Sequence, residues 1–455
     1  MSSSDDLDTK FLHGEAARPR KIYLVSRQAV VHETVKSFKW RRVNKCKAQS
    51  QLPPFDIGWI ESADLNFYRQ IRSHQRVSQT PGMEQLSRKK NLCRNLNAMR
   101  AICPQEYDIF PQTWLLPEEY PFLVKYLEKN PKSVVIVKPD GRCQGRGIFL
   151  TSNSADIDRH ENQVCQLYLD RPYLINGFKF DLRLYVLITS VDPLRVFVYD
   201  DGLVRLCTES YSAPDACNLS RSFMHLTNYA INKSSDAYQF NQDEKKTDSG
   251  NKWTLKSFFK WLEASNDDAD AAAIWPDIHQ VVAKAVISGS AHLRHQYRAN
   301  YPTPNNGALS FQLLGFDVLL DQDLKPWLIE INRNPSLKSD TPLDHNVKSK
   351  MLRDLFAIVV PEHGQKPKAS FHDRLTEPIS KLNRTESVNK QQNLELQRAQ
   401  KTGFKVILPE VSCDDEPGSV ISKLLANNQR IFDEKAKQKV RTCLLPIDKM
   451  IKSAF

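Results

Sequence analysis

The sequence predicts a mixed α/β protein, and three observations point to this class. Apolar runs of strand length recur between residues 134 and 206, each bounded by Gly, Pro or Asp. Two later segments, 253–264 and 277–298, have the apolar spacing of helices that pack on such a sheet. A last pair of apolar runs, within 315–336, is separated by a polar, proline-containing turn and predicts a hairpin. A chain of 455 residues can form two or three domains of usual size.

Composition and charge narrow the class further. The first ten residues are polar, unlike a signal peptide, and no apolar run is long enough to span a bilayer, so we expect a cytoplasmic protein. Nine cysteines without a CxxC pair argue against a disulfide framework or a zinc site. The net charge of +11 predicts a polyanionic partner, and charge alone leaves nucleic acid, acidic membrane and acidic protein tails open.

Composition divides the chain into four parts. Residues 1–20 are polar and predict a flexible arm. Residues 21–131 predict a small N-terminal α/β domain that contains the helix-like KKNLCRNLNAMRAI at 89–102. Residues 132–340 hold the strands, the two helices, the hairpin and a polar insertion near 234–252 that we expect to be a loop. Residues 341–455 are predicted to be largely helical and basic, with 20 Lys and Arg against 13 Asp and Glu from residue 345 onward, an excess of 7.

Carboxylates on the predicted hairpin form the first candidate site. Strand alternation predicts a shared core face made of Phe316, Val318, Leu320, Trp327, Ile329 and Ile331. A register that pairs Leu320 with Trp327 sets Asp317 opposite Glu330, with Asn332 on the same face. Like charges across an antiparallel pair repel, so we expect a cation between them, and oxygen ligands alone suit Mg²⁺. The alternative is that Asp317 caps the turn or faces solvent while Glu330 pairs with a lysine.

A glycine-rich loop follows the strand that ends at Lys138, in KPDGRCQGRGIFL. Glycines let backbone amides approach an anion closely and the lysine adds a point charge, so this segment predicts a phosphate cover. It is not the Walker pattern, which requires Gly-Lys-Ser/Thr at the start of a helix. A simple glycine-rich hairpin turn is the alternative.

The segment KFDLRLYVL places Lys179, Asp181 and Arg183 on one face of a strand, opposite an apolar face. Such a row is costly to bury unless ligands complete its pairing, and a solvated sheet face is the alternative. Arg205 is a further cation on a neighbouring predicted strand.

The segment HLTNYAINK begins at His225 and supplies short polar groups. Thr227 and Asn228 are suited to holding a substrate or a metal-bound water. His225 taken alone is more often a satisfied structural histidine than a catalytic base.

In order along the chain, these segments resemble the tubulin tyrosine ligase-like family, whose members are ATP-grasp ligases that join an amino acid to a carboxylate of tubulin. The resemblance covers about residues 85–340. It is carried by RKKNLCRNLNAMR, FPQTWLLP, KPDGRCQGRGIFL, QLYLDRPYLINGFKFDLRLYVL, MHLTNYAINK and LLGFDVLLDQDLKPWLIEINRNPSL. CQGRGIF and QLYLDRPYLINGFKFDLR are most similar to the glutamate-adding members. The resemblance implies a small N-terminal domain, a central domain and a C-terminal ATP-grasp domain, followed by a basic extension that binds microtubules or is a solvated helical tail.

The resemblance also implies site residues. ATP would contact Lys138, Arg142, Gln144, Gly145, Arg146, Gly147, Gln166, Leu167, Tyr168, Leu169, Lys179 and Asp181, with the loop 141–147 over the phosphates and 166–169 against the adenine. Mg²⁺ would be bound by Asp317, Glu330 and Asn332. Arg183 and Arg205 would meet the γ-phosphate and the carboxylate being activated, and Asn228 would lie at the substrate.

The function implied is an ATP- and Mg²⁺-dependent ligase that adds free glutamate to glutamate side chains of tubulin tails through an acyl phosphate. We expect a monomer on the cytoskeleton, with cilium or basal body as a family implication, and without nucleic-acid or membrane partners. A glycine or tyrosine ligase and a non-catalytic microtubule-binding protein on the same fold are the alternatives; for a nucleic-acid binder no recognised motif is present. Two places depart from the family's pattern, QRVSQTPGM at 75–83 and Asn334, where a serine is commoner.

Overall fold

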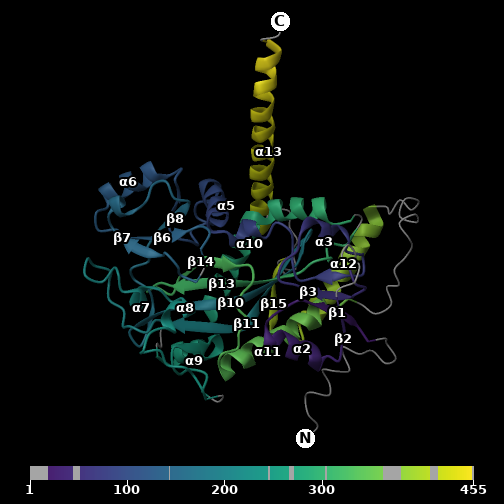
Figure 1. Ribbon diagram of the computed structural model, residues 1–455, viewed down its shortest axis with the longest axis horizontal. Helices are drawn as coiled ribbons and strands as arrows, with labels where there is room; N and C mark the ends of the chain where they lie inside the picture. The colour runs from purple at the N-terminus through teal and green to yellow at the C-terminus, as the bar shows by residue number, and fades with distance from the viewer. Residues whose placement is uncertain are drawn as a thin grey trace.

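The computed structural model describes residues 19–44, 52–142, 144–243, 246–265, 271–302, 305–361, 381–409 and 419–452. They form three sheets with helices around them (Figure 1), which confirms the mixed α/β class. In this described part no helix is long and apolar enough to cross a membrane. The predicted arm at 1–20 lies outside the described residues except for its last two positions.

The first sheet is parallel, in the order β2-β1-β3-β4. Its strands are β1 (Lys21–Leu24), β2 (Arg41–Val43), β3 (Ile57–Trp59) and β4 (Arg76–Val77). Helices α2 (Ala29–Ser37) and α3 (Leu65–Arg69) accompany it. The apolar residues Val30, Val31 and Val35 of α2 are buried, which fixes this helix against the sheet.

The second sheet is antiparallel, in the order β5-β8-β6-β7. It is made of β5 (Thr113–Leu116), β6 (Val135–Pro139), β7 (Phe149–Thr151) and β8 (Gln163–Leu167), with α6 (Tyr120–Lys129) beside β5 and the turn η1 (Ser154–Asp156). Before it come α4 (Glu84–Ser87) and α5 (Lys89–Ile102), and α5 has the bounds that the sequence predicts.

The central sheet is also antiparallel and runs β12-β11-β10-β13-β14, with β9 on β10 and β15 on β11. Its strands are β9 (Leu174–Ile175), β10 (Phe178–Val191), β11 (Leu194–Leu206), β12 (Lys252–Thr254), β13 (Gln312–Leu320), β14 (Pro326–Asn332) and β15 (Phe404–Leu408). Two short helices, α7 (Ser222–His225) and α8 (Tyr229–Asn232), follow β11. The described residues of the predicted insertion contain no helix or strand from 234 to 243 and from 246 to 251, as expected of a loop, and its last residue, Lys252, begins β12.

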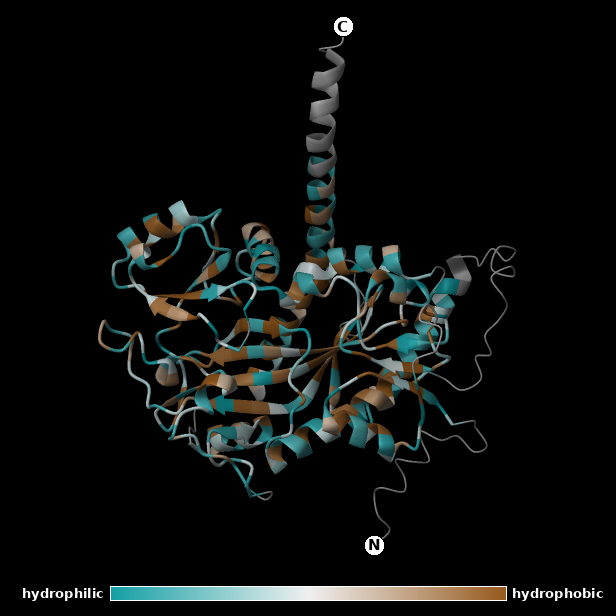
Figure 2. Cartoon of the chain, viewed as in Figure 1, coloured by the Kyte–Doolittle hydropathy of each residue, from teal (hydrophilic) through white to brown (hydrophobic). Residues whose placement is uncertain are grey.

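Helices cover both faces of the central sheet (Figure 1). Even-numbered residues of β10, from Phe180 to Ile188, join the core that includes α9 (Leu255–Ser265) and α10 (Ala271–Asn300). The odd-numbered Tyr185 and Leu187 pack in the core that includes α2 and α11 (Pro342–Val359). Figure 2 shows apolar residues concentrated along these strands. Lys179, Asp181 and Arg183 are also odd-numbered, so they lie on the same face of β10 as the buried Tyr185 and Leu187.

Lys179 and Asp181 are only 5% and 4% exposed, so the alternative of a solvated face on β10 is wrong and the row is buried. The predicted hairpin is partly wrong. Asp317 does pair with Glu330, but Leu320 pairs with Pro326 because a bulge leaves Ile329 without a partner on β13. As a result Leu328 and Ile331 are buried, while Trp327 and Ile329, which were predicted to be in the core, are only half-buried.

The chain beyond residue 340 forms α11, α12 (Lys381–Ala399), β15 and α13 (Val420–Lys452). Glu395 of α12 is fully buried between Arg76 and Arg195, at 3.0 and 2.9 Å. Helix α13 lies against α10 and then projects from the body (Figure 1). Strand pairing crosses both predicted domain boundaries, since β5 pairs with β8 and β15 pairs with β11.

Candidate active site

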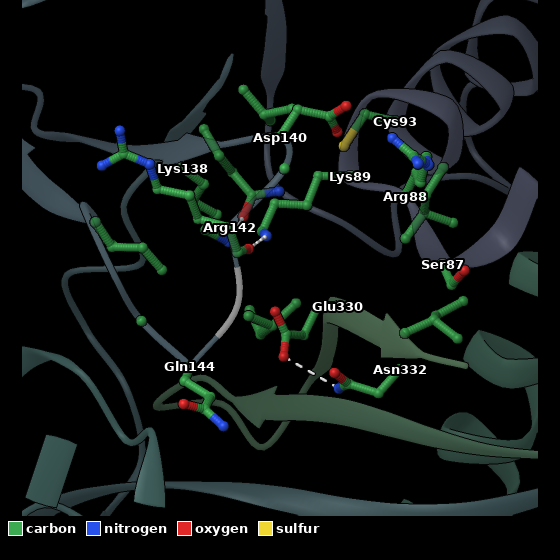
Figure 3. Close-up of a pocket in the computed structure, with 18 residues that line it drawn as sticks. Ser87, Arg88, Lys89, Cys93, Lys138, Asp140, Arg142, Gln144, Glu330 and Asn332 are labelled. Carbon is green, nitrogen blue, oxygen red and sulfur yellow. Dashed lines mark hydrogen bonds between the residues drawn. The ribbon is translucent and has the colours of Figure 1, made fainter. Parts of the chain in front are cut away.

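Two adjoining cavities lie between the second sheet and the central sheet. The larger, of about 290 Å³, is lined by Lys138, by the described part of 141–145 and by the end of β14. Figure 3 shows Glu330 and Asn332 on one side of it, and Lys89, Lys138 and Arg142 on the other. The smaller, of about 70 Å³, is lined by Lys138, Gln166, Glu330 and further residues, namely Leu167, Tyr168, Leu169, Lys179, Asp181, Asn228 and Asp317. Because Lys138, Gln166 and Glu330 line both cavities, the two form one composite site.

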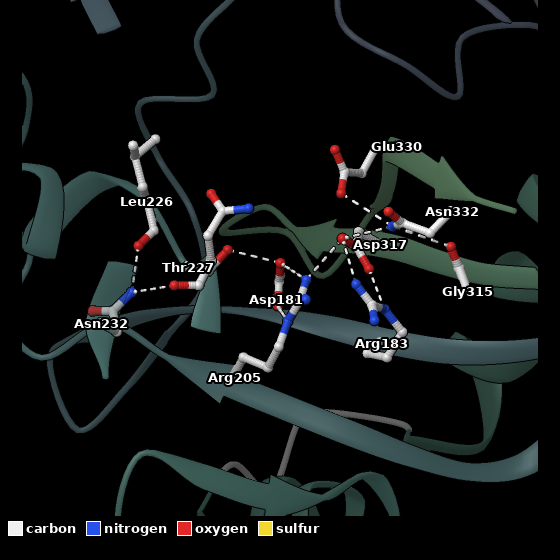
Figure 4. Close-up of polar contacts among 11 residues, drawn as sticks. Asp181, Arg183, Arg205, Leu226, Thr227, Asn232, Gly315, Asp317, Glu330 and Asn332 are labelled. Atoms are coloured by element: carbon white, nitrogen blue, oxygen red, sulfur yellow. Dashed lines mark hydrogen bonds and ion pairs between the residues drawn. The ribbon is translucent and has the colours of Figure 1, made fainter. Parts of the chain in front are cut away.

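An alternating row of arginines and carboxylates forms the floor of this site (Figure 4). The strand register sets Asp181 opposite Arg205, and Arg183 opposite Asp317. Arg205 donates two hydrogen bonds to Asp181, at 2.7 and 2.5 Å, and its Nη2 lies 2.9 Å from Asp317 Oδ2. Arg183 donates two to Asp317, at 2.5 and 3.0 Å. Paired planar groups of this kind hold one another in fixed orientation.

These contacts set the protonation of the carboxylates. Burial alone would raise the pKa of Asp317, but Arg183 and Arg205 bring it well below its ordinary value. Burial raises the pKa of Asp181 although Arg205 opposes the shift. Burial, and next the charge of Asp317, raises the pKa of Glu330. Of the two carboxylates on the hairpin, the charge of Asp317 is therefore compensated by arginines and the charge of Glu330 is not.

Glu330 has no cationic partner within hydrogen-bond distance among the described residues. Its Oε1 accepts a hydrogen bond of 3.0 Å from Asn332 Nδ2, and the alternative, pairing with a lysine, is absent from the part of the chain that the structure describes. Over the same residues no group of three or more His, Cys, Asp or Glu is arranged to hold a metal. Two carboxylates and an amide oxygen nevertheless fit Mg²⁺, which takes one or two carboxylates and leaves further positions to phosphate and water.

The two lysines reach the site from different sheets. Lys138 of β6 donates to Gln166 Oε1 at 2.8 Å, and Lys179 of β10 donates to the Tyr168 hydroxyl at 2.8 Å. His225 contacts Tyr168 through Nδ1 at 2.9 Å and the Asn218 carbonyl through Nε2 at 3.1 Å. With both nitrogens bonded and 2% exposure, His225 is a structural histidine, the reading that the sequence favoured.

The glycine-rich loop lies over the larger cavity. Gly145 has a φ of +78°, and a Cβ there would lie 2.4 Å from Ile231 Cδ1, so only glycine fits this approach to α8. Lys89 Nζ donates to the Arg142 carbonyl at 2.8 Å and ties the loop to α5. Gln144 also lines the larger cavity, whereas Arg146 and Gly147 are exposed and line neither.

Several residues at the site were not assigned a role from sequence. Arg88 and Lys89 line the larger cavity; they belong to the segment RKKN, and their basic character was the available signal. Thr227, which the sequence suggested for a substrate or a metal-bound water, donates to Asp181 Oδ2 at 2.7 Å and so supports the floor. Lys252 lies next to Arg205 in the strand register, and it shares Asp344 with Lys348 at 2.6 Å each.

Comparisons with known proteins agree with this geometry. The family pattern described as tubulin-tyrosine ligase family matches residues 69–368. The chain is 39% identical to the tubulin polyglutamylase ttll6 of Danio rerio over 84% of this chain and 49% of that protein. It is 42% identical to a probable beta-tubulin polyglutamylase of Tetrahymena thermophila over 71% of this chain and 27% of that protein. It is 43% identical to the human tubulin polyglutamylase TTLL13 over 66% and 36% of the two chains. The chain thus spans about half the length of these relatives, or less.

Proposed function

Because the chain belongs to the tubulin-tyrosine ligase family, we propose that it is an ATP- and Mg²⁺-dependent ligase that joins free glutamate to glutamate side chains of tubulin tails. The names of its relatives support glutamate and tubulin as substrates. The match covers about half of the length of the first of these relatives. The activity of that whole protein is therefore a proposal for this chain.

The proposed fold of the catalytic core is an ATP-grasp arrangement, with the nucleotide between the second sheet and the central sheet. The position of both cavities between these sheets supports it. Residues 166–169 would lie along the adenine, and Lys138 and Lys179 would hold the phosphates, with the loop 141–147 above them.

The observation that carries the proposal is the buried row of Arg183, Asp317, Arg205 and Asp181 beneath an uncompensated Glu330. A structural protein would have little use for Glu330 at this place, because a charge near the core is costly unless it is paired, and only the row beneath it is paired. Asp317, Glu330 and Asn332 would hold Mg²⁺ after the Asn332 amide turns its oxygen toward the ion. Arg183 and Arg205 would then orient the reacting phosphoryl group and the acceptor carboxylate, with Asn228 at the substrate.

When bound, Mg²⁺-ATP supplies the γ-phosphoryl group that converts the acceptor carboxylate to an acyl phosphate, from which the amine of glutamate displaces phosphate. The chain's own part is alignment and charge neutralisation. No protein nucleophile is required, and the buried thiols fit this role poorly: burial raises the pKa of Cys93 and of Cys165 to about 12.

We further propose three sequence units that share sheets across their boundaries, an N-terminal domain at 21–131, the catalytic core at 132–340 and a basic extension at 341–455. The extension would contact the acidic microtubule surface, and the protein would act as a monomer on the cytoskeleton. The projecting position of α13 supports a contact surface beyond the body of the fold (Figure 1).

The test is incubation of the purified chain with microtubules, Mg²⁺-ATP and, separately, glutamate, glycine and tyrosine, followed by intact mass measurement of tubulin. We expect mass increments with glutamate alone. Glu330→Gln should abolish them, and Glu263→Gln, the same chemical change on the exposed surface of α9, should not. Increments with glycine or tyrosine instead, or an unchanged rate in folded Glu330→Gln protein, would contradict the proposal.

A further inference from the structure

Lys138 and Lys179 differ from the arginines of the site because their hydrogen-bond partners are neutral. Arg183 and Arg205 each contact a carboxylate within 2.9 Å. Neither Lys138 nor Lys179 forms an ion pair with any residue of the described ranges, although both are less than 10% exposed. Each donates instead to a neutral acceptor. The ammonium charges are therefore held in place without being neutralised.

Gln166, the partner of Lys138, begins a chain of hydrogen bonds in which each group has only one possible donor or acceptor role. The ammonium group can only donate, so Gln166 Oε1 accepts from it at 2.8 Å. Gln166 Nε2 then donates to Thr113 Oγ1 at 2.9 Å. The Thr113 hydroxyl donates in turn to the Pro111 carbonyl at 2.8 Å. The chain ends on a backbone oxygen, and Gln166 and Thr113 are 4% and 2% exposed.

The partner of Lys179 begins a second chain of the same kind. The Tyr168 oxygen accepts from Lys179 at 2.8 Å, and we assign its hydrogen to His225 Nδ1 at 2.9 Å because the other ring nitrogen of a neutral His225 must donate to a carbonyl. Nδ1 must then be unprotonated, and His225 Nε2 donates to the Asn218 carbonyl at 3.1 Å. This chain also ends on a backbone oxygen, and it fixes the imidazole as neutral with its proton on Nε2.

The first acceptor of each hydrogen-bond chain comes from the same segment. Gln166 is on β8 and Tyr168 follows its end, where the Tyr168 N–H still bonds the Val134 carbonyl beside β6. Residues two apart on a strand share a face, so this segment presents both acceptors to the cavities together. Gln166 and Tyr168 line the smaller cavity with both lysines.

We propose that Gln166 and Tyr168 are positioning residues for Lys138 and Lys179, that Thr113 and His225 act through them, and that their neutrality leaves both ammonium charges free to bind nucleotide phosphates. This inference rests on the proposed use of ATP at this site. It does not depend on glutamate or tubulin as the other substrates.

The electrostatics agree with this geometry. Burial lowers the pKa of Lys138, and it lowers the pKa of Lys179 to about 8, as expected of cations that lack a paired anion. Burial, and next the charge of Lys179, lowers the pKa of His225, so the imidazole stays neutral. The other charged neighbours of His225 are Arg221 and Glu209, which act on its pKa in opposite directions, and Tyr211 packs edge-on against its ring at 5.9 Å.

The test compares paired variants by their affinity for a non-hydrolysable ATP analogue, measured by calorimetry with Mg²⁺. Thr113→Val and His225→Phe keep shape but break one link each, and we expect about a fivefold weaker affinity, the usual worth of a hydrogen bond between neutral groups. Thr113→Ser and His225→Gln can remake both bonds of the link and should bind within about twofold of wild type. The KM for ATP should follow the affinity, with kcat less affected.

A double variant separates positioning from general destabilisation. Tyr168→Phe removes the acceptor while keeping the ring 4.2 Å from Lys179 Nζ. If His225 acts through Tyr168, adding His225→Phe should weaken binding no further. Tyr107→Phe is the matched control, because the buried Tyr107 hydroxyl donates to the Lys284 carbonyl outside the site. It should lower the unfolding temperature without changing analogue affinity.

Two results with the variants would overturn the inference. One is wild-type affinity in folded Thr113→Val and His225→Phe, and the other is an equal loss in their Ser and Gln counterparts. If the wild-type protein binds the analogue but modifies no tubulin, the proposed substrates are contradicted. The two chains of hydrogen bonds behind Lys138 and Lys179 are still tested by the affinity of the variants. A wild-type chain that binds no ATP analogue would overturn both proposals.

Discussion

Asp317 lies directly opposite Glu330 in the β13–β14 ladder, yet only Asp317 is within ion-pair distance of arginines. The two pKa values consequently move apart, that of Asp317 down and that of Glu330 up. A hairpin selected for stability alone would not keep this pair, because like charges face to face across a ladder are unfavourable.

Removing the charge of Glu330 should therefore stabilise the metal-free protein while it removes activity. We expect Glu330→Gln to raise the free energy of unfolding by about 1 kcal/mol and to lower the ligase rate at least about 100-fold. Thermal unfolding without Mg²⁺ checks the first effect, with Glu263→Gln as the control. A less stable Glu330→Gln protein would mean that the carboxylate is already compensated.

Arg205 neutralises the buried carboxylates of Asp181 and Asp317. Arg205→Ala leaves Asp181 buried without its cation, and we expect a loss of about 3–5 kcal/mol in the free energy of unfolding. The double variant Arg205→Ala/Asp181→Asn removes both charges and should recover more than about 1 kcal/mol of that loss. Urea unfolding measures both. Strictly additive losses would show that the pair contributes nothing as a pair.

Nucleotide affinity should depend on pH through Lys179. Its pKa is lowered to about 8 by burial, so the binding form is lost as pH rises past that value. Affinity should then fall by up to about tenfold per pH unit. The unfolded chain binds the proton more tightly between about pH 8 and 10.5, so over this window the contribution of Lys179 to stability rises with pH, opposite to affinity.

Calorimetric titration with an ATP analogue from pH 7 to 9.5 tests this dependence. Lys179→Arg stays charged throughout and should give a flatter profile, whatever its absolute affinity. Parallel profiles for wild type and Lys179→Arg would assign the titration to another group, and Lys138, whose pKa burial also lowers, would be the first to examine.

The glycine-rich loop offers a test with an internal control. Gly145→Ala must relieve a φ of +78° and a 2.4 Å approach to Ile231, whereas a Cβ on Gly141 meets no atom within 4 Å. We expect Gly145→Ala to raise the KM for ATP at least about tenfold by displacing the loop, and Gly141→Ala to leave it unchanged. Equal KM values in both variants would show that the loop does not cover the nucleotide.

Local patterns predicted much of this molecule. Alternation along KFDLRLYVL placed Lys179, Asp181 and Arg183 on one face, and the hairpin motif paired Asp317 with Glu330. These predictions succeed because the side chains involved are set by one strand or by neighbours across one turn. The bulge at Ile329 escaped prediction, since period-two alternation has no signal for a residue that skips the ladder.

Contacts between distant segments could not be predicted. Thr113, Gln166 and Lys138 come from three strands, and Tyr168 meets His225 across 57 positions. Glu395 was an unremarked residue in a basic helical tail, but it is bonded to Arg76 and Arg195 inside the core. Only the folded chain shows which polar residue closes which hydrogen bond.

The pairing of β15 with β11 has a consequence for how the protein is made. Residues 196–199 of β11 form a short apolar edge that β15 covers, and β15 lies about 200 residues further along the chain. During synthesis this edge therefore stays unpaired until about 200 further residues have been made. A version that ends at residue 361 would expose it permanently, and should aggregate where the longer chain stays dispersed.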